Sequence, residues 1–583
     1  MSRRFNSLLI ASALSVALVW SYFRIHDSPS PSWSLNSIIQ GSDETEINSS
    51  NLLLTNELQK HYAYATAVCN IKQVEPALVL TNSLKLSNTT YPVLVVLDDS
   101  VLKQYEGHFR ELEANIVQVH QEDCNVAKMA LWSLTKFDKI AYIDPISVVV
   151  KNIDYIFSLP VNSVLMDKWP AYVDRLLIFK PEMTIYEGLM KQVRLRPGSS
   201  DSAITRHLAS AKIHPIPEHA VILVGEKSVT PHNANLLMYA DELTPWNWYK
   251  IQDKSWLKQW DQVALWHWRH HRNRIEYLFN SPKEVLNSIN RTEAVCNDKP
   301  FPKVFPVTEK FSVLFGTYNP ERIDHVANVI KHLAASELVH TIYLTWHNPK
   351  LEVNNELRIL QDTLQKPLVI LKQTFDSLNN RFNPIEGLET EAIYILDDDI
   401  VVSLPDLEFT FQVWKNRQDS IVGHFPRFHS YDPSTSTSVY AMADDKRPSF
   451  SIVLTKSMFA RSEYLFAYTC LMPPVLHAYV DEHMNCEDIG FSFMVSGLTA
   501  TTNAYVRTQE RIRDYGLNQG ISTNNHHIAA RRKCVTDFIE TYWDKRDPTQ
   551  MSSEIVSVFE KVKIQRAKWD TPIPDVQHTG VSP

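Results

Sequence analysis

Short apolar runs alternate with helix-like segments in two successive rounds, and this alternation limits the fold more than any other feature of the chain. The runs are YAYATAVCN, YPVLVVLDD, NIVQVHQ and KIAYIDP in the first round and FSVLFGTYN, TIYLTWHN, PLVILKQT and AIYILDDD in the second. Segments between them, such as ERIDHVANVIKHLAAS, have apolar residues at helical spacing. This pattern predicts α/β domains with largely parallel sheets. We expect two such domains, at residues 61–280 and 307–545, joined by a proline-containing linker at residues 281–306.

The composition agrees with a large globular protein. The chain has 583 residues, of which 44% are hydrophobic and 21% are charged. A single hydrophobic core does not grow to this size, so two or more domains are expected. The formal net charge of -8 provides no basic footprint, which argues against nucleic acid as a partner.

The N-terminal region carries one long uncharged apolar run, SLLIASALSVALVWSYF, at residues 7–23. Its length is close to the minimum that spans a bilayer, and the two arginines before it favour a cytoplasmic N-terminus. We predict a cytoplasmic tail at residues 1–6 and an uncleaved type II anchor at residues 7–23, with a cleaved signal peptide as the alternative. Residues 24–60 are predicted to form a stem, and residues 546–583 a polar tail.

Two further signals agree with a secretory lumen. Asn-x-Ser/Thr sequons for glycosylation occur at Asn48, Asn88 and Asn290. The six cysteines are even in number and include no CxxC pair, which argues against a zinc site and is compatible with disulfides in an oxidising compartment.

Three aspartates, Asp397, Asp398 and Asp399, follow one another at the end of a strand-like run in YILDDDIVV. Adjacent like charges repel, and burial makes each carboxylate harder to ionise, so a counter-charge is expected. Ligands of open α/β sheets bind outside the carboxyl ends of the strands. An Asp-x-Asp there can hold a hard divalent cation while a diphosphate supplies further oxygens, as a bound nucleotide-sugar would. Both rounds have the pattern of one architecture in two copies. At the corresponding place the first round has AYIDPISVVV, with one aspartate instead of three.

A series of motifs runs through the second round in a fixed order: TYN, SLNNRFNP, YILDDDIV, DLEFTFQVW, IVGHFPR, FSIVLTKSMF, HMNCEDIGFSFMVS and GISTNNHHIAARRKC. With these motifs the segment from Phe311 to Trp543 resembles the C-terminal domain of the exostosins and exostosin-like proteins, glycosyltransferase family 64. The resemblance implies a GT-A fold, a UDP-sugar donor, Mn²⁺ as cofactor, and retention of the anomeric configuration.

The resemblance also implies roles for individual positions. Asp399 would be the manganese ligand, and Asp488 and Arg531 would be catalytic. The positions implied in donor binding are Asn348, Asn380, Arg381, Asp397, Asp398, Glu487 and His527. A disulfide between Cys486 and Cys534 would tie the two late motifs together.

Structural readings compete with these roles. Asp488 can cap a helix that begins at Ile489, because Asp is a favoured capping residue. The run from Arg531 to Lys533 can be a solvated helical face. The family often has a nucleotide-binding arginine just after TYN, but Pro320 stands there in this chain, which leaves Arg322 as an open substitute.

The first domain resembles glycosyltransferase family 8, the glycogenin-like retaining enzymes, over residues 62–246 and chiefly through KMALWSLTKFDKIAYIDPISVVVKNIDYIF. Its metal motif is eroded: the family's Asp-x-Asp is Asp144-Pro-Ile146 here, its Asn-Ser-Gly is DRL at residues 174–176, and its metal-binding histidine is Met238. Isoleucine offers no oxygen, and a thioether is a poor partner for a hard ion. We predict that this domain does not catalyse metal-dependent transfer and instead holds an acceptor, braces the second domain or mediates assembly.

The segment WHWRHH at residues 266–271 falls on a predicted helix. His267 and His271 have the i, i+4 spacing of a metal pair. The alternative is an interdomain helix whose tryptophans pack and whose histidines face water.

These observations predict a single-pass type II membrane protein of the Golgi or endoplasmic reticulum with a lumenal catalytic part. Its C-terminal domain is expected to transfer a sugar, foremost an N-acetylhexosamine, from a UDP-sugar to a glycan or glycolipid. Transfer of mannose or another hexose, including from a GDP-sugar, and a non-catalytic lumenal scaffold or lectin-like protein are the alternatives.

Overall fold

A computed structural model describes residues 61–120, 123–165, 175–195, 200–217, 221–224, 234–239, 244–250, 261–296, 305–443, 447–516 and 527–558. Within these ranges no helix is long and apolar enough to cross a membrane. The predicted cytoplasmic tail, anchor and stem at residues 1–60, Asn48 among them, lie outside the described residues, as do residues 559–583.

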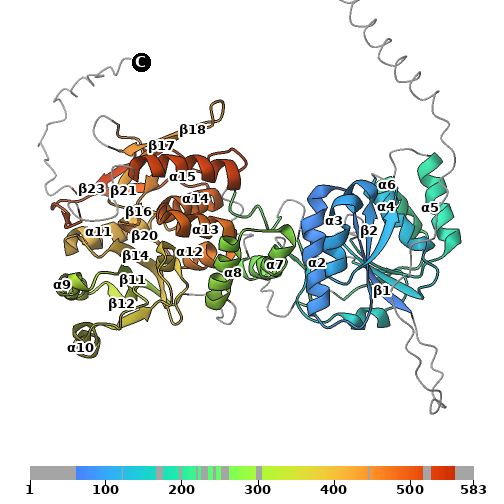
Figure 1. Ribbon diagram of the computed structural model, residues 1–583, viewed down its shortest axis with the longest axis horizontal. Helices are drawn as coiled ribbons and strands as arrows, with labels where there is room; N and C mark the ends of the chain where they lie inside the picture. The colour runs from blue at the N-terminus through green and yellow to red at the C-terminus, as the bar shows by residue number, and fades with distance from the viewer. Residues whose placement is uncertain are drawn as a thin grey trace, which may run out of the picture. The chain divides into compact units, whose positions relative to one another are not determined.

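The first round of strands forms a seven-stranded sheet in the order β3-β2-β1-β4-β7-β6-β8 (Figure 1). Its strands are β1 (Tyr62–Val68), β2 (Val93–Asp98), β3 (Asn115–Val119), β4 (Lys139–Ile143), β6 (Ser163–Val164), β7 (Leu176–Phe179) and β8 (His214–Pro215). A three-stranded sheet is built from β5 (Ser147–Val149), β10 (Leu236–Tyr239) and β9 (Val221–Val224). The helices of this half are α2 (Val74–Leu86), α3 (Asp99–Glu111), α4 (Cys124–Met129), α5 (Met183–Leu195) and α6 (Ser200–Ala209).

The second round forms an eight-stranded sheet in the order β13-β12-β11-β14-β20-β16-β21-β23. Its strands are β11 (Val307–Thr317), β12 (Val339–Trp346), β13 (Leu368–Lys372), β14 (Thr390–Asp397), β16 (Val422–Gly423), β20 (Ser457–Arg461), β21 (Ala504–Arg507) and β23 (Ile555–Ser557). Two smaller sheets pair β15 (Ile400–Val401) with β22 (Arg513–Asp514), and β17 (Pro426–Asp432) with β18 (Thr437–Met442) and β19 (Ile452–Val453). The helices are α9 (Ile323–Ala334), α10 (Asn355–Thr363), α11 (Leu404–Lys415), α12 (Glu463–Phe466), α13 (Pro474–His483), α14 (Glu487–Thr499) and α15 (His527–Tyr542).

Both large sheets share one order at their centres. In each, the third, second, first and fourth strands of the round lie side by side and run parallel. An antiparallel strand then follows the fourth, β7 in the first sheet and β20 in the second. The predicted α/β class with parallel strands is confirmed, and the antiparallel neighbour is an addition that the alternation of runs did not indicate.

Helices cover both faces of the central strands, which explains why these strands are apolar on both sides. In β1, Tyr64 and Val68 pack with α2 and α3, whereas Ala63 and Ala65 pack on the opposite face with residues of α4 and α6. Figure 1 shows α2 and α3 on one side of this sheet and α4 to α6 on the other. The second sheet is divided in the same way between two hydrophobic clusters.

Helix α9 illustrates how the sequence specifies these layers. A short 3-10 turn precedes it, capped by Asn319, whose side chain accepts from the amide of Glu321. The helix then buries Ile323, Val326 and Ile330 with their neighbours at helical spacing, and this stripe packs on one face of β11 and β12.

Helix α7 (Gln262–Arg274) confirms the helix predicted around WHWRHH. Trp268 is buried in the core, as the packing alternative expected. His271 does not face water: it is buried, its Nδ1 lies 3.4 Å from Nδ2 of Asn82, and burial lowers the pKa of its imidazole to about 3. Within the described ranges no group of three or more His, Cys, Asp or Glu side chains is placed to hold a metal ion.

Two segments differ from the predicted boundaries. Residues 283–296, assigned to the linker, form helix α8, which buries Val285, Ile289 and Cys296. The predicted tail also begins inside the fold: β23 pairs parallel with β21, and the backbones of Phe450 and Ser552 exchange hydrogen bonds. Both segments are short and half polar, so their own sequences carry little sign of the surfaces that receive them.

All six cysteines are paired, which confirms the expectation of disulfides. The bonds are Cys69–Cys124, Cys296–Cys470 and the implied Cys486–Cys534. Of the sequons, Asn88 and Asn290 are exposed, at the end of α2 and on α8.

Candidate active site

The three aspartates lie at the carboxyl end of the central strand β14, as the sequence predicted. Asp397 is the last residue of β14 and pairs in register with Gly316 of β11. Parallel neighbours end at the same edge of a sheet. Thr317, the last residue of β11, therefore reaches the aspartates, and its hydroxyl donates to Asp398 Oδ2 at 2.8 Å.

Asp398 is balanced by an arginine that follows TYN. Nη1 of Arg322 donates to Asp398 Oδ1 at 3.0 Å and lies 3.6 Å from Oδ2 of Asp399. Burial nevertheless raises the pKa of Asp398 above its usual range. Arg322, two residues after Pro320, thus brings a guanidinium to the aspartates.

Asp399 differs from its neighbours because part of its carboxylate is unsatisfied. Among the described residues no group donates a hydrogen bond to its buried Oδ1. Burial, together with the charges of Asp397 and Asp398, raises the pKa of Asp399 to about 6. A buried carboxylate oxygen that receives no hydrogen bond is costly, so this oxygen fits a cation ligand.

The loop after β22 closes over Asp399. The amide of Tyr515 donates to the Asp399 backbone carbonyl at 2.9 Å. The next residue is Gly516, where a Cβ would lie 2.0 Å from Asp399 Oδ2. A residue with a side chain at position 516 would displace the Asp399 carboxylate from this position.

Arg381 links the aspartates to the NCED motif. Its guanidinium contacts Asp397 Oδ1 at 3.2 Å, Thr455 Oγ1 at 2.6 Å and Glu487 Oε1 at 3.5 Å. Burial by itself would lower the pKa of Arg381, but these carboxylates raise it. Burial beside Asp488 raises the pKa of Glu487 to about 7.

Asp488 and Arg531 form a buried ion pair. Both carboxylate oxygens of Asp488 accept from Arg531 Nη2. Arg531 also donates from Nε to the Tyr440 hydroxyl at 2.9 Å and from Nη1 to Asn485 Oδ1 at 3.1 Å. Asp488 raises the pKa of Arg531 against the opposing effect of burial. The guanidinium is therefore held in one orientation by three different side chains.

The Cys486–Cys534 disulfide explains how this pair is brought together. Cys486 directly precedes α14 with a left-handed backbone, φ 76°, which is unusual for a residue other than glycine. Cys534 lies three residues after Arg531 on α15, so both occupy one face of that helix. The solvated-face reading fails for Arg531, which is 6% exposed, whereas Arg532 and Lys533 are exposed.

The remaining predicted residues lie around this centre with local partners. His527 is the first residue of α15, with Nδ1 3.4 Å from Asn485 Nδ2, and burial, followed by the charge of Arg531, lowers its pKa. Asn380 donates to the carbonyl of Phe375 at 2.8 Å. Asn348 follows β12 and accepts from the amide of Lys350 at 3.1 Å, which closes a turn.

Four residues of the centre were not selected from the sequence. Thr317 and Asn485 stand inside quoted motifs, so motif membership could have found them. Gly516 and Tyr440 gave no signal, because their contacts join segments far apart in the chain. The cap reading of Asp488 is wrong, because α14 begins at Glu487 and Asp488 lies inside its first turn, while Cys486 stands at the cap position.

The corresponding edge of the first sheet is built differently. Asp144 follows β4, and its Oδ1 accepts from the amide of Ile146 at 2.9 Å. Met238 is fully buried and pairs with Ser147, next to Ile146, while Arg175 donates to the carbonyl of Tyr239 at 3.1 Å. Asp174 lies outside the described residues. The positions that differ from the family 8 pattern therefore lie close together, and the loss of the metal motif stays a prediction.

Comparison with known proteins places this centre in a family. The Glycosyl transferase family 64 domain matches residues 311–550. Glycosyltransferase family protein 64 C3 of Arabidopsis thaliana is 30% identical over 253 residues, 40% of this chain and 75% of that protein. Glycosylinositol phosphorylceramide mannosyl transferase 1 of the same plant is 29% identical over 245 residues, 40% of this chain and 72% of that protein. Exostosin-2 of Homo sapiens is 25% identical over 306 residues, 49% of this chain and 42% of that protein.

The fold and these matches define the class of protein as a glycosyltransferase. The chain belongs to glycosyltransferase family 64, through its C-terminal half. The matched part spans most of the plant proteins and less than half of exostosin-2.

Proposed function

We propose that the C-terminal half is a retaining, Mn²⁺-dependent transferase that moves a sugar, foremost an N-acetylhexosamine, from a UDP-sugar to a glycan or glycolipid. The observation that carries the proposal is the buried, unpartnered Oδ1 of Asp399 at the carboxyl end of β14. Asp399 would hold the metal ion, with the donor diphosphate supplying further oxygens. When bound, the ion supplies positive charge against the developing charge of the leaving diphosphate.

Side chains around the aspartates would bind the rest of the donor. Arg322 and Arg381 lie beside the aspartates and provide fixed positive charge for the nucleotide diphosphate. Asp397, Asp398, Asn348, Asn380 and His527 would complete the donor site. Glu487 would lie next to the sugar, where its raised pKa allows it to carry a proton near neutral pH.

Asp488 and Arg531 would act at the reacting centre. Both oxygens of Asp488 are engaged by Arg531, and an ion-paired carboxylate is a weak nucleophile. This favours attack by the acceptor hydroxyl on the face that the leaving group departs from. Asp488 then stabilises the positive charge of the sugar ring, while a double displacement through Asp488 is the competing mechanism.

A second donor class has a specific observation in its favour. The relative that is 29% identical is named a mannosyl transferase that acts on a glycosylinositol phosphorylceramide. Transfer of mannose or another hexose to a glycolipid by the same centre is therefore the second candidate function.

The first half is proposed to be a degenerate domain of the family 8 type, without metal-dependent catalysis of its own. Its Asp144 is engaged with a local amide, and Ile146 and Met238 provide no ligand for a hard ion. We further propose that residues 7–23 anchor the protein in the Golgi or endoplasmic reticulum membrane, with both halves in the lumen.

Replacement of Asp399 by Asn tests the assignment, because it keeps the size of the side chain and removes the charge. We expect Mn²⁺-dependent turnover of a panel of UDP- and GDP-sugars to fall by about 100-fold or more. The matched control is Asp362→Asn on the exposed side of α10. Unchanged turnover in Asp399→Asn would overturn the metal assignment, and a wild type that turns over no donor would favour a lumenal scaffold.

A further inference from the structure

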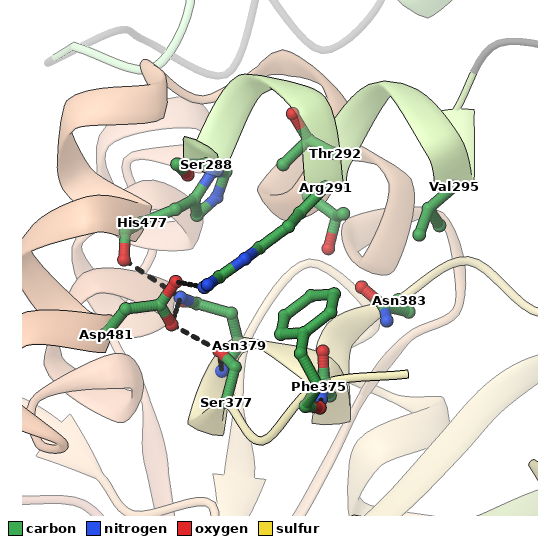
Figure 2. Close-up of a pocket in the computed structure, with 12 residues that line it drawn as sticks. Ser288, Arg291, Thr292, Val295, Phe375, Ser377, Asn379, Asn383, His477 and Asp481 are labelled. Atoms are coloured by element: carbon green, nitrogen blue, oxygen red, sulfur yellow. Dashed lines mark hydrogen bonds and ion pairs between the residues drawn. The ribbon is translucent and has the colours of Figure 1, made fainter. Parts of the chain in front are cut away.

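A pocket lies at the contact between helix α8 and the second domain. It lies between α8 and the segment 375–383 and encloses about 300 Å³, counting the open space at its mouth. Figure 2 shows Arg291 crossing it from α8 to Asp481 of α13. Helix α8 lies outside residues 311–550, so this wall is supplied from outside the stretch that the family model matches.

Arg291 is the main contact across the pocket. Its Nη1 donates to Asp481 Oδ2 at 2.9 Å, and its guanidinium lies 4.4 Å from the ring centroid of Phe375. The other oxygen of Asp481 accepts from the hydroxyl of Ser377 and from Nδ2 of Asn379, the latter at 2.9 Å. One carboxylate thus receives donors from α8 and from the segment SLNNRF.

These contacts fix the start of the 3-10 turn η9 (Leu378–Phe382). Ser377 caps it, because its hydroxyl oxygen accepts from the amide of Asn379 at 3.1 Å. Asn379 is also bound to the carbonyl of His477 at 3.0 Å and accepts from the Tyr468 hydroxyl at 2.9 Å. Within the same turn, Arg381 contacts Asp397 and Glu487.

Helix α8 itself is fastened to the second domain. The Cys296–Cys470 disulfide holds its last residue, and the apolar side of the helix, Val285 and Ile289, packs against Ala478 of α13. Because α8 is held at its start by packing and at its end by a disulfide, the backbone that carries Arg291 has a fixed position.

We propose that Arg291 is a positioning residue for the donor site: through Asp481 and Phe375 it holds the segment 375–383 so that Arg381 meets the nucleotide diphosphate. The inference rests on the proposed nucleotide-sugar site. It gives a role to helix α8, which lies outside the residues that the family model matches.

The exposure of the pair indicates what kind of effect to expect. The side chain of Arg291 is 38% exposed and that of Asp481 is 18% exposed, and partly exposed ion pairs add little to global stability. Loss of Arg291 should therefore loosen one turn rather than unfold the domain. Local opening of this kind is seen by backbone amide exchange.

The experiment compares Arg291→Ala and Arg291→Lys with the wild type in the full chain, with Asn287→Ala as control on the exposed side of the same helix. The first readout is hydrogen–deuterium exchange of residues 375–383 without ligand. We expect about tenfold faster exchange in Arg291→Ala, recovery of most protection in Arg291→Lys, and no change in the control.

The second readout is the dissociation constant of UDP in the presence of Mn²⁺. We expect it to rise about tenfold in Arg291→Ala with an unchanged melting temperature, as for other supporting residues around a site. Unchanged exchange, or faster exchange with unchanged UDP affinity, would overturn the positioning role. A wild type that binds no UDP would instead overturn the proposed donor, and unchanged exchange in Arg291→Ala would then still show that Arg291 does not hold the segment 375–383.

Discussion

Gly516 approaches Asp399 so closely that a Cβ on the glycine would lie 2.0 Å from the Asp399 Oδ2 atom. The contact joins a loop near the C-terminal end of the domain to the end of its central strand. The residue at position 516 therefore determines where the Asp399 carboxylate can lie, and with it the geometry of the proposed metal site.

Gly516→Ala should therefore impair metal binding with little effect on folding, because the short Asp399 side chain can swing aside while the backbone stays. We expect Mn²⁺-dependent turnover to fall by about 10- to 100-fold at unchanged melting temperature. Gly107→Ala in α3 is the control, since a Cβ there meets nothing within 4 Å. A fully active Gly516→Ala enzyme would show that Asp399 need not stay where the structure places it.

Arg531→Lys should disable the reacting centre despite keeping the charge. A lysine cannot bond both oxygens of Asp488 and also reach Tyr440 and Asn485. We expect kcat/KM to fall by about 100-fold, together with a lower melting temperature, because Asp488 stays buried with a poorer partner. The neighbouring Arg532→Lys is the exposed control. Equal losses in both variants would contradict a specific role for the ion pair.

Glu487 should make stability depend on pH. Its carboxyl titrates at a pKa of about 7 in the folded protein, where it is buried beside Asp488, and at about 4.3 in an unfolded chain. Because the folded state binds this proton more tightly, the contribution is complete below about pH 4 and is lost as the pH rises through about 7. We expect the melting temperature of Glu487→Gln to fall less than that of the wild type as the pH rises from about 5 to about 8.

The control for this measurement is Glu356→Gln on the exposed surface of α10. Identical pH profiles for Glu487→Gln and the wild type would mean that the carboxyl is ionised throughout in the folded protein.

Asp144→Asn should leave Mn²⁺-dependent transfer within about twofold of the wild type, since Asp144 belongs to the first sheet and supplies no group to the proposed reacting centre. Asp144 accepts from the Ile146 amide, a bond that an asparagine oxygen can also accept. Assays of Asp144→Asn and Asp399→Asn under the same conditions compare the contribution of the first sheet to activity with that of the second. A large loss in Asp144→Asn would place a working metal site in the first half.

The sequence predicted those parts of the centre whose position follows from local pattern. The run YILDDD is strongly apolar and ends in acids, so its place at the end of a central strand could be read directly. The pairing of Cys486 with Cys534, and with it the approach of Arg531 to Asp488, followed from the order of motifs shared with family 64.

The rest depends on contacts between distant segments, which local pattern does not record. Tyr440 reaches Arg531 from a hairpin 91 residues away, and its run TSVYAM looks like any edge strand. The prolines that follow helix α8 predict a linker, and they dominate that stretch of sequence. The burial of α8 depends on a partner surface on α13 that lies about two hundred residues further on.

The Cys296–Cys470 bond imposes an order on biosynthesis. The two cysteines are 174 residues apart, so a growing chain exposes Cys296 long before its partner is made. Cys69 and Cys124, 55 residues apart, can pair while the second half is still being translated. A polypeptide that ends between Cys296 and Cys470 keeps an odd thiol at the end of α8. In an oxidising compartment that thiol marks the molecule as incomplete, so oxidation of this pair reports that translation has passed Cys470.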